Sequence, residues 1–336
     1  MILVTGGTGL VGSHLLHKLV EDGKKVKAIY RNKEKIKAVK RVFSYYSSNY
    51  EALFLKIEWI EATLNDIPSL EIAFKDVTHV YHCAAFISFD TKEYIALRRI
   101  NIEGTANIVN LSISHNVKKL CYVSSIATIG KEENDQLITE ETHWNPEAEQ
   151  SVYSITKYGA ETEVWRGTQE GLNAVVVNPG VIIGPGFWRG GGSGSLIKMV
   201  YKGVQRYTKG VVGYVDVMDV VNPMIQLMES DITNERYILV SENLSYQDFF
   251  TKTASYLNVQ APKKLASKTL LNFAWRIDWL RSLLLSKRRR LMKQTTKTIT
   301  TKAYYSNKKI IETLNYNFKS IDASLTETCQ FFLKEL

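Results

Sequence analysis

A tyrosine and a lysine stand four residues apart in the run Tyr153-Ser154-Ile155-Thr156-Lys157. On a helix, this spacing places both side chains on one face. A phenol with a pKa of about 10 is a poor acid–base catalyst at neutral pH, whereas a neighbouring ammonium group favours the phenolate and lowers that pKa. Tyr153 could therefore give a proton to a carbonyl oxygen during reduction, or remove one during alcohol oxidation.

A serine pair, Ser124-Ser125, directly follows the apolar run Leu120 to Val123, which has the pattern of a buried strand. The Ser125 hydroxyl could hold the same substrate oxygen by a hydrogen bond and stabilise a developing alkoxide. Many exposed helices carry a tyrosine and a lysine at this spacing by chance. The catalytic interpretation therefore depends on their combination with these serines and with a glycine-rich turn near the N-terminus.

Three glycines, Gly6, Gly9 and Gly12, lie between the strand-like run Ile2 to Val4 and a helical pattern from about Ser13 to Glu21. In a phosphate-binding turn, one glycine allows the tight turn, another lets the backbone approach a pyrophosphate, and the last lets helix and strand pack closely. The N-terminus of the helix offers free N–H groups to the phosphates. This context favours a dinucleotide-binding turn over a purely structural one.

The second predicted strand, Val26 to Tyr30, is followed by Arg31 and, two residues later, Lys33. An NAD-preferring site usually carries an acidic residue about 20 residues beyond the glycines, where it binds the ribose 2′-hydroxyl. A guanidinium group suits a 2′-phosphate instead, by its charge and its forked geometry. We therefore expect NADP(H) to be favoured over NAD(H). The alternative is that Arg31 and Lys33 belong to a solvated charged turn.

Strand and helix patterns alternate along the first two thirds of the chain, and the strands are continuous apolar runs. Both features are typical of parallel βαβ units with helices on both faces of the sheet. The predicted fold class is α/β, a Rossmann-like doubly wound parallel sheet with a smaller, mostly helical C-terminal substrate lobe. We expect residues 1–184, with 210–241 returning, to form the NAD(P)-binding domain, and residues 185–209 and 242–336 to form the substrate lobe.

The composition narrows the class of protein but not its partner. Three cysteines without CxxC spacing argue against a disulfide framework or a zinc site, so no metal is expected. The net charge of +9 suits phosphate-bearing ligands, nucleic acid or an anionic membrane. Because no nucleic-acid-binding motif is present, we expect no nucleic acid partner. Without a signal peptide or an apolar run of spanning length, a cytoplasmic location is expected.

Taken together, these motifs resemble those of the extended short-chain dehydrogenase/reductase group. This group includes NAD(P)-dependent epimerases and dehydratases, dihydroflavonol reductases and 3β-hydroxysteroid dehydrogenases. The resemblance covers nearly the whole chain. Its motifs are Thr5 to Gly12, His82-Cys83-Ala84-Ala85, Asn101 to Thr105, Val123 to Ala127, Tyr153 to Lys157, Asn178-Pro179-Gly180, Gly184-Pro185-Gly186 and Val215 to Val220.

The resemblance implies further site residues. Lys157 would also bind the nicotinamide ribose hydroxyls. Asn101 would support a catalytic set of Ser125, Tyr153 and Lys157. Ser124 is the alternative to Ser125 as the catalytic serine. The expected cofactor-binding residues are Gly6, Thr8, Gly9, Leu10, Val11, Gly12, Arg31, Lys33, Thr63, Leu64, Ala84, Ala85, Val123, Ser124, Tyr153, Lys157, Pro179, Gly180, Val181 and Ile182.

Three departures from the group's pattern carry information. Thr63 stands where an aspartate usually holds the adenine amino group, so either Thr63 substitutes for it weakly or the adenine sits differently. Dehydratases of the group follow the catalytic hydroxyl residue with Asp-Glu, whereas Ile126-Ala127 follows Ser125 here, which disfavours dehydration. The run Val211 to Tyr214 replaces an Arg-Asp-Phe-like run of sugar-nucleotide enzymes and weakens that interpretation.

Ligands of open α/β sheets bind at the carboxyl ends of the strands. The residues of these loops that we expect to face the substrate are mostly aromatic, which favours an apolar or aromatic ketone or aldehyde over a phosphorylated sugar as substrate. The alternative is that the aromatic side chains pack the two lobes together. The expected substrate residues are Phe86, Ser88, Phe89, Ser125, Phe187 and Trp188.

The segment Leu270 to Leu285 mixes apolar residues with Arg276, Asp278 and Arg281. We favour a lid helix or a helix of the substrate lobe, with one solvated face. The alternative is an amphipathic helix that touches an anionic membrane as a peripheral contact.

The leading functional prediction is an NADPH-dependent oxidoreductase that reduces a small-molecule carbonyl, with Tyr153 as proton donor, Lys157 tuning it and Ser125 polarising the carbonyl. The alternatives are an NAD-dependent sugar-nucleotide epimerase and a non-catalytic NADPH-binding regulator on the same fold. The group often forms dimers through two helices, so a homodimer is possible.

Overall fold

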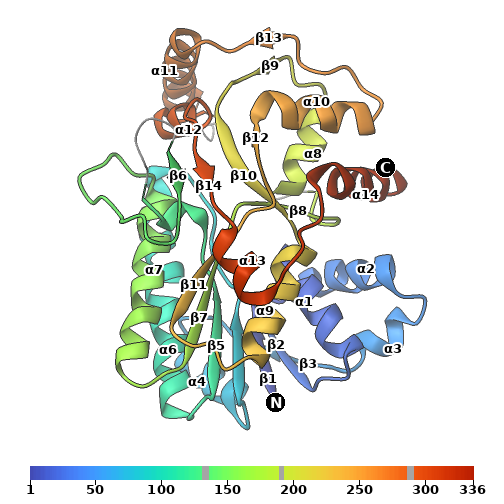
Figure 1. Cartoon of the computed structure of the whole chain (residues 1–336), viewed down its shortest axis with the longest axis vertical. Helices are drawn as coiled ribbons and strands as arrows, with labels where there is room; N and C mark the ends of the chain where they lie inside the picture. The colour runs from blue at the N-terminus through green and yellow to red at the C-terminus, as the bar shows by residue number, and fades with distance from the viewer. Residues whose placement is uncertain (131–135, 189–192, 286–290) are drawn as a thin grey trace.

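A seven-stranded sheet forms the centre of the computed structural model, which describes residues 1–130, 136–188, 193–285 and 291–336 (Figure 1). All its neighbouring strands are parallel, in the order β11-β7-β5-β4-β1-β2-β3. The order reverses between β1 and β4, and ligands of such sheets bind beyond the carboxyl ends of the strands at this point. The strands are β1 (Ile2–Thr5), β2 (Val26–Tyr30), β3 (Ile57–Glu61), β4 (His79–His82), β5 (Lys119–Val123), β7 (Ala174–Pro179) and β11 (Glu235–Leu239).

Helices cover both faces of this sheet, because successive strand residues point to opposite faces. Val4 and Tyr81 pack into a core layer with α1, α2 and α9, whereas the adjacent Leu3 and Val80 pack into a second layer with α4, α6 and α7. This arrangement confirms the predicted doubly wound α/β fold. The helices are α1 (Leu10–Glu21), α2 (Ile36–Tyr46), α3 (Tyr50–Phe54), α4 (Ile67–Phe74), α6 (Gly104–Ser114), α7 (Val152–Gln169) and α9 (Met218–Glu229).

A second, smaller core lies beside the carboxyl end of the sheet. It includes Trp188, Tyr214 and Phe249, and it packs a three-stranded sheet of order β12-β10-β8 against helices α8, α10 and α14. Within residues 210–241, which we expected to belong to the cofactor-binding domain, β10 pairs with β8 and β12, while α9 and β11 join the main sheet. The bounds are β8 (Val181–Ile183), α8 (Ser193–Tyr201), β10 (Val211–Asp216), β12 (Glu242–Ser245), α10 (Tyr246–Tyr256) and α14 (Ile321–Lys334).

The remaining elements are short, apart from α11. Two small parallel pairs join β13 to β9 and β14 to β6. In the part of the chain that the structure describes, no helix combines the length and the apolar character needed to cross a bilayer. The bounds are η1 (Lys33–Lys35), η2 (Thr91–Glu93), α5 (Tyr94–Leu97), η3 (Arg98–Glu103), η4 (Ile126–Thr128), β6 (Leu137–Ile138), β9 (Arg206–Tyr207), β13 (Lys264–Leu265), α11 (Lys268–Leu285), α12 (Lys293–Thr298), β14 (Tyr304–Tyr305) and α13 (Lys308–Leu314).

Candidate active site

The glycine turn after β1 is held together by backbone contacts that no larger residue would allow. Gly6 adopts a positive φ of 70°, and a Cβ at this position would lie 2.6 Å from the Ala84 nitrogen. A Cβ at Gly12 would lie 2.3 Å from the Gly6 oxygen. At Gly9, by contrast, the Gly6 oxygen at 3.4 Å is the nearest atom that a Cβ would meet. Gly6 and Gly12 are therefore required by packing, whereas Gly9 keeps a surface open.

Helix α1 begins at Leu10, three residues before the predicted start, because Gly9 serves as an extended N-cap. The first turn thus contains the predicted cofactor residues Leu10, Val11 and Gly12. This turn has no acidic residue, and the described residues supply no side-chain cap. Its backbone N–H groups therefore lack intrahelical acceptors and can bind phosphate oxygens.

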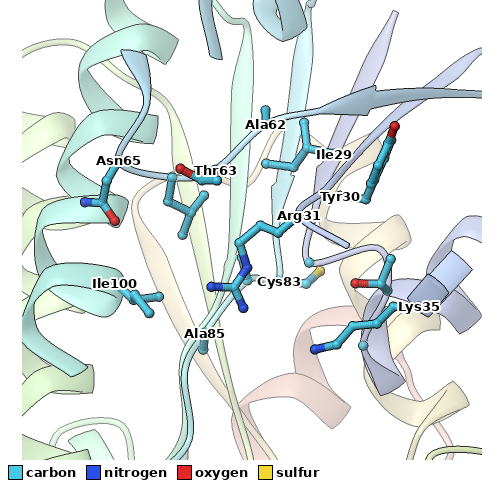
Figure 2. A pocket seen from close by; sticks show the side chains of 15 residues that line it. Ile29, Tyr30, Arg31, Lys35, Ala62, Thr63, Asn65, Cys83, Ala85 and Ile100 are labelled. Carbon is cyan, nitrogen blue, oxygen red and sulfur yellow. The ribbon is translucent and has the colours of Figure 1, made fainter. Parts of the chain in front are cut away.

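A cavity opens between this turn and the ends of β2, β3 and β4, and Figure 2 shows the Arg31 guanidinium extending among its lining side chains. Lys35 also lines this cavity, whereas Lys33, which we predicted, is not among the lining residues. Asn32 caps η1 by accepting from the Glu34 nitrogen, and Lys35 is the last residue of this short turn. The cavity is lined by Gly6, Thr8, Gly9, Ile29, Tyr30, Arg31, Lys35, Ala62, Thr63, Leu64, Asn65, Cys83, Ala84, Ala85 and Ile100.

The other predicted cofactor residues lie along the same edge of the sheet but do not line this cavity. Val123 and Ser124 stand at the end of β5. Pro179 ends β7, and Val181 and Ile182 begin β8, which pairs with β10. Gly180 packs tightly between these strands, because a Cβ there would lie 2.3 Å from the Gly213 oxygen.

The hydroxyl groups of Tyr153 and Ser125 meet at the carboxyl end of β5. A hydrogen bond from the Ser125 side chain acts to lower the pKa of Tyr153, but desolvation outweighs it and raises that pKa to about 12. Lys157 is not among the causes of the shift, which differs from our expectation that the ammonium group lowers the tyrosine pKa. Ser125 also accepts a hydrogen bond from the Ala127 nitrogen at 3.1 Å.

Lys157 is almost fully buried, and its ammonium group is directed at other partners. Its Nζ donates to the Tyr122 hydroxyl at 2.5 Å and to the Val123 carbonyl oxygen at 2.9 Å. It also lies 4.3 Å from the centre of the Tyr122 ring. Desolvation lowers the pKa of Lys157 to about 7, while the nearby Glu161 carboxylate acts in the opposite direction. These contacts explain why Lys157 does not lower the Tyr153 pKa in this structure.

Asn101 lies in η3, a π-helical turn of a kind frequent at functional sites, and it fixes the loop after β4. Its side chain accepts from the Phe86 nitrogen at 2.8 Å and donates to the Phe86 oxygen at 3.0 Å. It also donates to the Thr156 hydroxyl on α7 at 3.2 Å. Ser88 is buried in the same loop, where its hydroxyl accepts from the Asp90 nitrogen. Asn101 thus connects this loop to the helix that carries Tyr153.

The predicted aromatic substrate residues fall into two groups. Phe89 is exposed, and its ring lies 5.5 Å from the Tyr153 ring. Phe187 is half-buried and has a positive φ of 57°. Trp188 is buried in the second core, and its indole nitrogen donates to Glu335 at 3.0 Å. Its surroundings correspond to the packing alternative rather than to a substrate contact.

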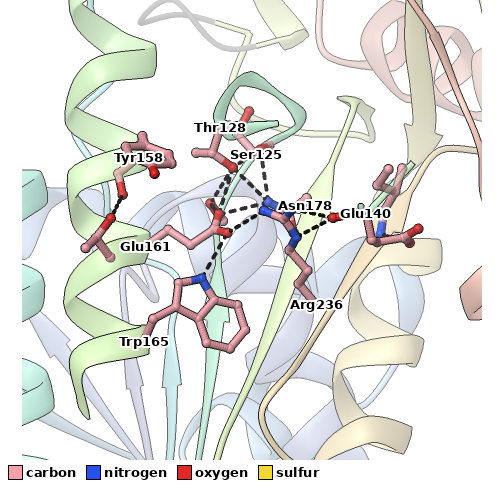
Figure 3. Close-up of polar contacts among 11 residues, drawn as sticks. Ser125, Thr128, Glu140, Tyr158, Glu161, Trp165, Asn178 and Arg236 are labelled. Carbon is pink, nitrogen blue, oxygen red and sulfur yellow. Dashed lines mark hydrogen bonds and ion pairs between the residues drawn. The ribbon is translucent and has the colours of Figure 1, made fainter. Parts of the chain in front are cut away.

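A buried carboxylate that the sequence interpretation missed lies one helical turn beyond Lys157. Figure 3 shows Glu161 at the centre of a polar cluster that joins α7 to β5 and β7. Its Oε2 accepts from Ser124 at 2.5 Å, Thr128 at 2.7 Å and Asn178 at 3.0 Å. Its Oε1 accepts from the Trp165 indole nitrogen at 3.3 Å. Because the Ser124 hydroxyl is used here, the geometry favours Ser125 as the hydroxyl that remains available to a substrate.

Arg236 on β11 completes this cluster from the far edge of the sheet. Its Nη1 lies 3.4 Å from Glu161 Oε1, and its Nε donates to the Glu140 carbonyl oxygen at 2.9 Å. Glu140 in turn accepts from the Ile238 nitrogen at 2.8 Å. The cluster therefore ties α7 and the loop from Ser124 to Thr128, which we call the serine loop, to strands β5, β7 and β11. The signal for Glu161 in the sequence was its spacing of four residues from Lys157.

Alanine at two of the glycines should separate packing from binding. We expect Gly12→Ala to lower the free energy of unfolding by about 2 kcal/mol, because its Cβ overlaps the Gly6 backbone. Gly9→Ala should retain normal stability but weaken dinucleotide binding, since its methyl group enters the open turn. Urea denaturation and a binding titration measure the two effects. Equal behaviour of both variants in both assays would contradict this division of roles.

Neutralising Glu161 should loosen the cluster. In Glu161→Gln the amide NH₂ would face hydroxyl, amide and indole donors, so we expect a loss of about 1–3 kcal/mol in unfolding free energy. The change also removes a charge that raises the Lys157 pKa, so Lys157 should lose its proton at a lower pH.

Glu163→Gln is the matched control, because Glu163 lies on the same helix and forms a surface pair with Arg166 worth at most about 1 kcal/mol. Both variants are compared by urea denaturation. If Glu161→Gln were no less stable than Glu163→Gln, the cluster would not hold the site together.

Comparisons with known proteins agree with this geometry. The model of the NAD dependent epimerase/dehydratase family matches residues 2–239. A Synechocystis sp. protein assigned as a dihydroflavonol 4-reductase is 30% identical over 278 residues, which cover 81% of this chain and 77% of the relative. Cinnamoyl-CoA reductase 1 of Petunia hybrida is 26% identical over 257 residues, which cover 74% of each chain.

A solved structure shows the same fold. The UDP-glucose 4-epimerase of Thermus thermophilus in complex with NAD superposes with a TM-score of 0.75 at 19% identity, covering 100% of this chain and 99% of that one. The family match spans the glycine turn, the paired hydroxyls and the Tyr-Lys helix described above. This chain therefore belongs to the NAD dependent epimerase/dehydratase family, within the extended short-chain dehydrogenases/reductases, and is an NAD(P)-dependent enzyme of the oxidoreductase type.

Proposed function

We propose that this enzyme is an NADPH-dependent reductase that converts the ketone or aldehyde of a hydrophobic small molecule into the alcohol. The observation that carries this proposal is the meeting of the Tyr153 and Ser125 hydroxyls beside an exposed aromatic ring, Phe89. Two hydroxyl donors side by side are suited to bind and protonate one carbonyl oxygen. The relatives whose names describe reductases support the same reaction class.

When bound, the nicotinamide cofactor would supply the hydride for the carbonyl carbon. Tyr153 holds its proton at neutral pH, because its pKa is raised to about 12. It therefore carries a proton that it can give to the substrate oxygen, while Ser125 donates a hydrogen bond to that oxygen. Because a raised pKa makes the phenol a weaker acid, efficient transfer needs a positive charge beside it. Lys157 would hold the nicotinamide ribose hydroxyls. Its positive charge would stabilise the Tyr153 phenolate that remains after proton transfer.

The preference for NADPH rests on the charge of the cavity. Arg31 and Lys35 are the charged residues that line it, and none of its described lining residues is acidic. A guanidinium beside the adenosine ribose can bind a 2′-phosphate with two parallel hydrogen bonds. The close backbone approach at Gly6 and Gly12 and the open surface at Gly9 fit a pyrophosphate at the start of α1.

The division of the chain and its location are part of this proposal. We assign cofactor binding to residues 1–184 and 210–241, and substrate binding to residues 185–209 and 242–336. The substrate would enter between them near Phe86 and Phe89, in line with a hydrophobic carbonyl compound. A cytoplasmic location completes the proposal, and cell fractionation would test it.

A sugar-nucleotide epimerase with tightly held NAD is the second candidate, favoured by the fold shared with UDP-glucose 4-epimerase. The run Val211 to Tyr214 counts against it. This run forms the start of β10, and the side chains of Val211 and Tyr214 are buried in the protein. They cannot supply the polar contacts that a nucleotide would need. Recovery of tightly bound NAD with the purified protein would favour the epimerase.

Replacing the tyrosine hydroxyl tests the reductase directly. In Tyr153→Phe we expect turnover of hydrophobic ketones or aldehydes to fall by about 100-fold or more, because the proton donor is lost, while NADPH affinity changes little. Tyr158→Phe is the matched control, since Tyr158 lies on the same helix and stacks on Trp144 instead. It should retain full activity. Near-normal turnover in Tyr153→Phe would refute the mechanism, and NADPH binding without turnover in the parent enzyme would favour a regulator.

A further inference from the structure

Helix α11 exposes its apolar face, whereas a surface helix normally turns its apolar face to the core and its polar face to solvent. Leu270, Phe273, Ile277, Leu280 and Leu284 recur at intervals of three and four residues and so share one helix face. All five side chains are exposed, with Phe273 at 64% and Leu284 at 71% of their full accessible area. A surface helix usually hides such a face in the core.

The opposite face of α11 carries a charged pair toward the protein. Asp278 and Arg281 form an ion pair at 2.7 Å, with side chains that are only 11% and 26% exposed. The second carboxylate oxygen of Asp278 accepts from the Leu291 nitrogen at 3.0 Å. Leu271 is the buried apolar residue of the helix. The ion pair lies within α11, and Asp278 also ties the helix to the segment that leads into α12, while the apolar face is left exposed.

Basic residues are frequent in the sequence around α11. Residues 263–302 contain twelve lysines and arginines but one acidic residue, Asp278, so this segment has a formal net charge of +11, against +9 for the whole chain. Lys293 and Lys297 share Glu149 as an ion-pair partner. Figure 1 places α11, β13 and β9 at one end of the molecule, and the exposed Lys263, Lys264 and Arg206 belong to this end.

From these observations we propose that the exposed face of α11 docks onto an anionic lipid bilayer. Leu, Phe and Ile side chains would enter the boundary between headgroups and acyl chains, while surrounding lysines and arginines contact acidic headgroups. Trp279, which is half-exposed, has the amphipathic character that suits this boundary. The helix lies on the membrane in this arrangement and does not cross it.

A second copy of the chain is a poorer occupant for this face. In a symmetric dimer the same patch is used on both subunits, so two basic segments, each with a formal charge of +11 over residues 263–302, would be brought together. Like charges across an interface oppose association. An anionic bilayer supplies both an apolar layer and the opposite charge. This inference does not depend on the substrate or cofactor proposed above.

Vesicle co-sedimentation of the full chain tests the proposal. The parent protein should pellet with vesicles of phosphatidylcholine and phosphatidylglycerol at roughly 3:1, bind vesicles of phosphatidylcholine alone much less, and be released partly by high salt. Phe273→Glu with Leu284→Glu should abolish pelleting. Lys263→Glu with Lys264→Glu should weaken it and reduce its dependence on phosphatidylglycerol.

Leu55→Glu is the matched control, because Leu55 is 82% exposed and lies away from α11, between α3 and β3. It should pellet like the parent. Circular dichroism confirms that each variant is folded. Pelleting that survives the Phe273 and Leu284 changes would overturn the proposal. A parent protein that does not pellet with the vesicles would also overturn it. In that case, light scattering that shows a dimer of the parent, and monomers of the Phe273 and Leu284 variant, would identify a second copy as the occupant of this face.

Discussion

Glu161 is a carboxylate buried between a helix and a sheet, and burial of a charge is tolerated only when its oxygens are paired. Hydroxyl, amide, indole and guanidinium groups from α7, β7, β11 and the serine loop must therefore converge on one point. This requirement fixes the position of α7 relative to the strand ends. Tyr153 and Lys157 are carried on the same helix, and Ser125 follows Ser124 in the loop. The catalytic geometry thus depends on a carboxylate that does not itself face the substrate side.

A second set of contacts ties the cofactor side to the same edge of the sheet. The Thr5 hydroxyl lies 2.6 Å from His82 Nδ1, and His82 Nε2 lies 2.9 Å from the Thr105 hydroxyl. Desolvation lowers the pKa of His82 to about 3, so this histidine is a neutral hydrogen-bonding link. Its ring stacks on Tyr122, the partner of Lys157. The end of β1, which begins the glycine turn, is therefore connected through buried side chains to the catalytic lysine.

The sequence was sufficient for features that local patterns determine. The glycine turn, the apolar strands and the spacing of Tyr153 and Lys157 predicted the sheet, the order of its elements and the edge where the site lies. Features that depend on distant segments were missed. The role of Glu161 depends on its contacts with Asn178 and Arg236, which are distant in the sequence and are brought close only by the fold. Lys35, the last residue of the capped turn η1, lines the cavity in place of Lys33. The exposure of the apolar face of α11 could not be predicted either, because helical spacing does not show which face of a helix is buried.

Binding of the two dinucleotides tests the central claim that the cavity beside Arg31 is a cofactor site built for a 2′-phosphate. The cofactor-stripped protein is titrated with NADPH and NADH, alongside Arg31→Ala and the control Lys33→Ala. We predict that NADPH binds at least about tenfold more tightly than NADH, a difference of about 1.4 kcal/mol. This preference should disappear in Arg31→Ala and persist in Lys33→Ala. Tighter binding of NADH, or binding of neither dinucleotide, would contradict the assignment of the cavity.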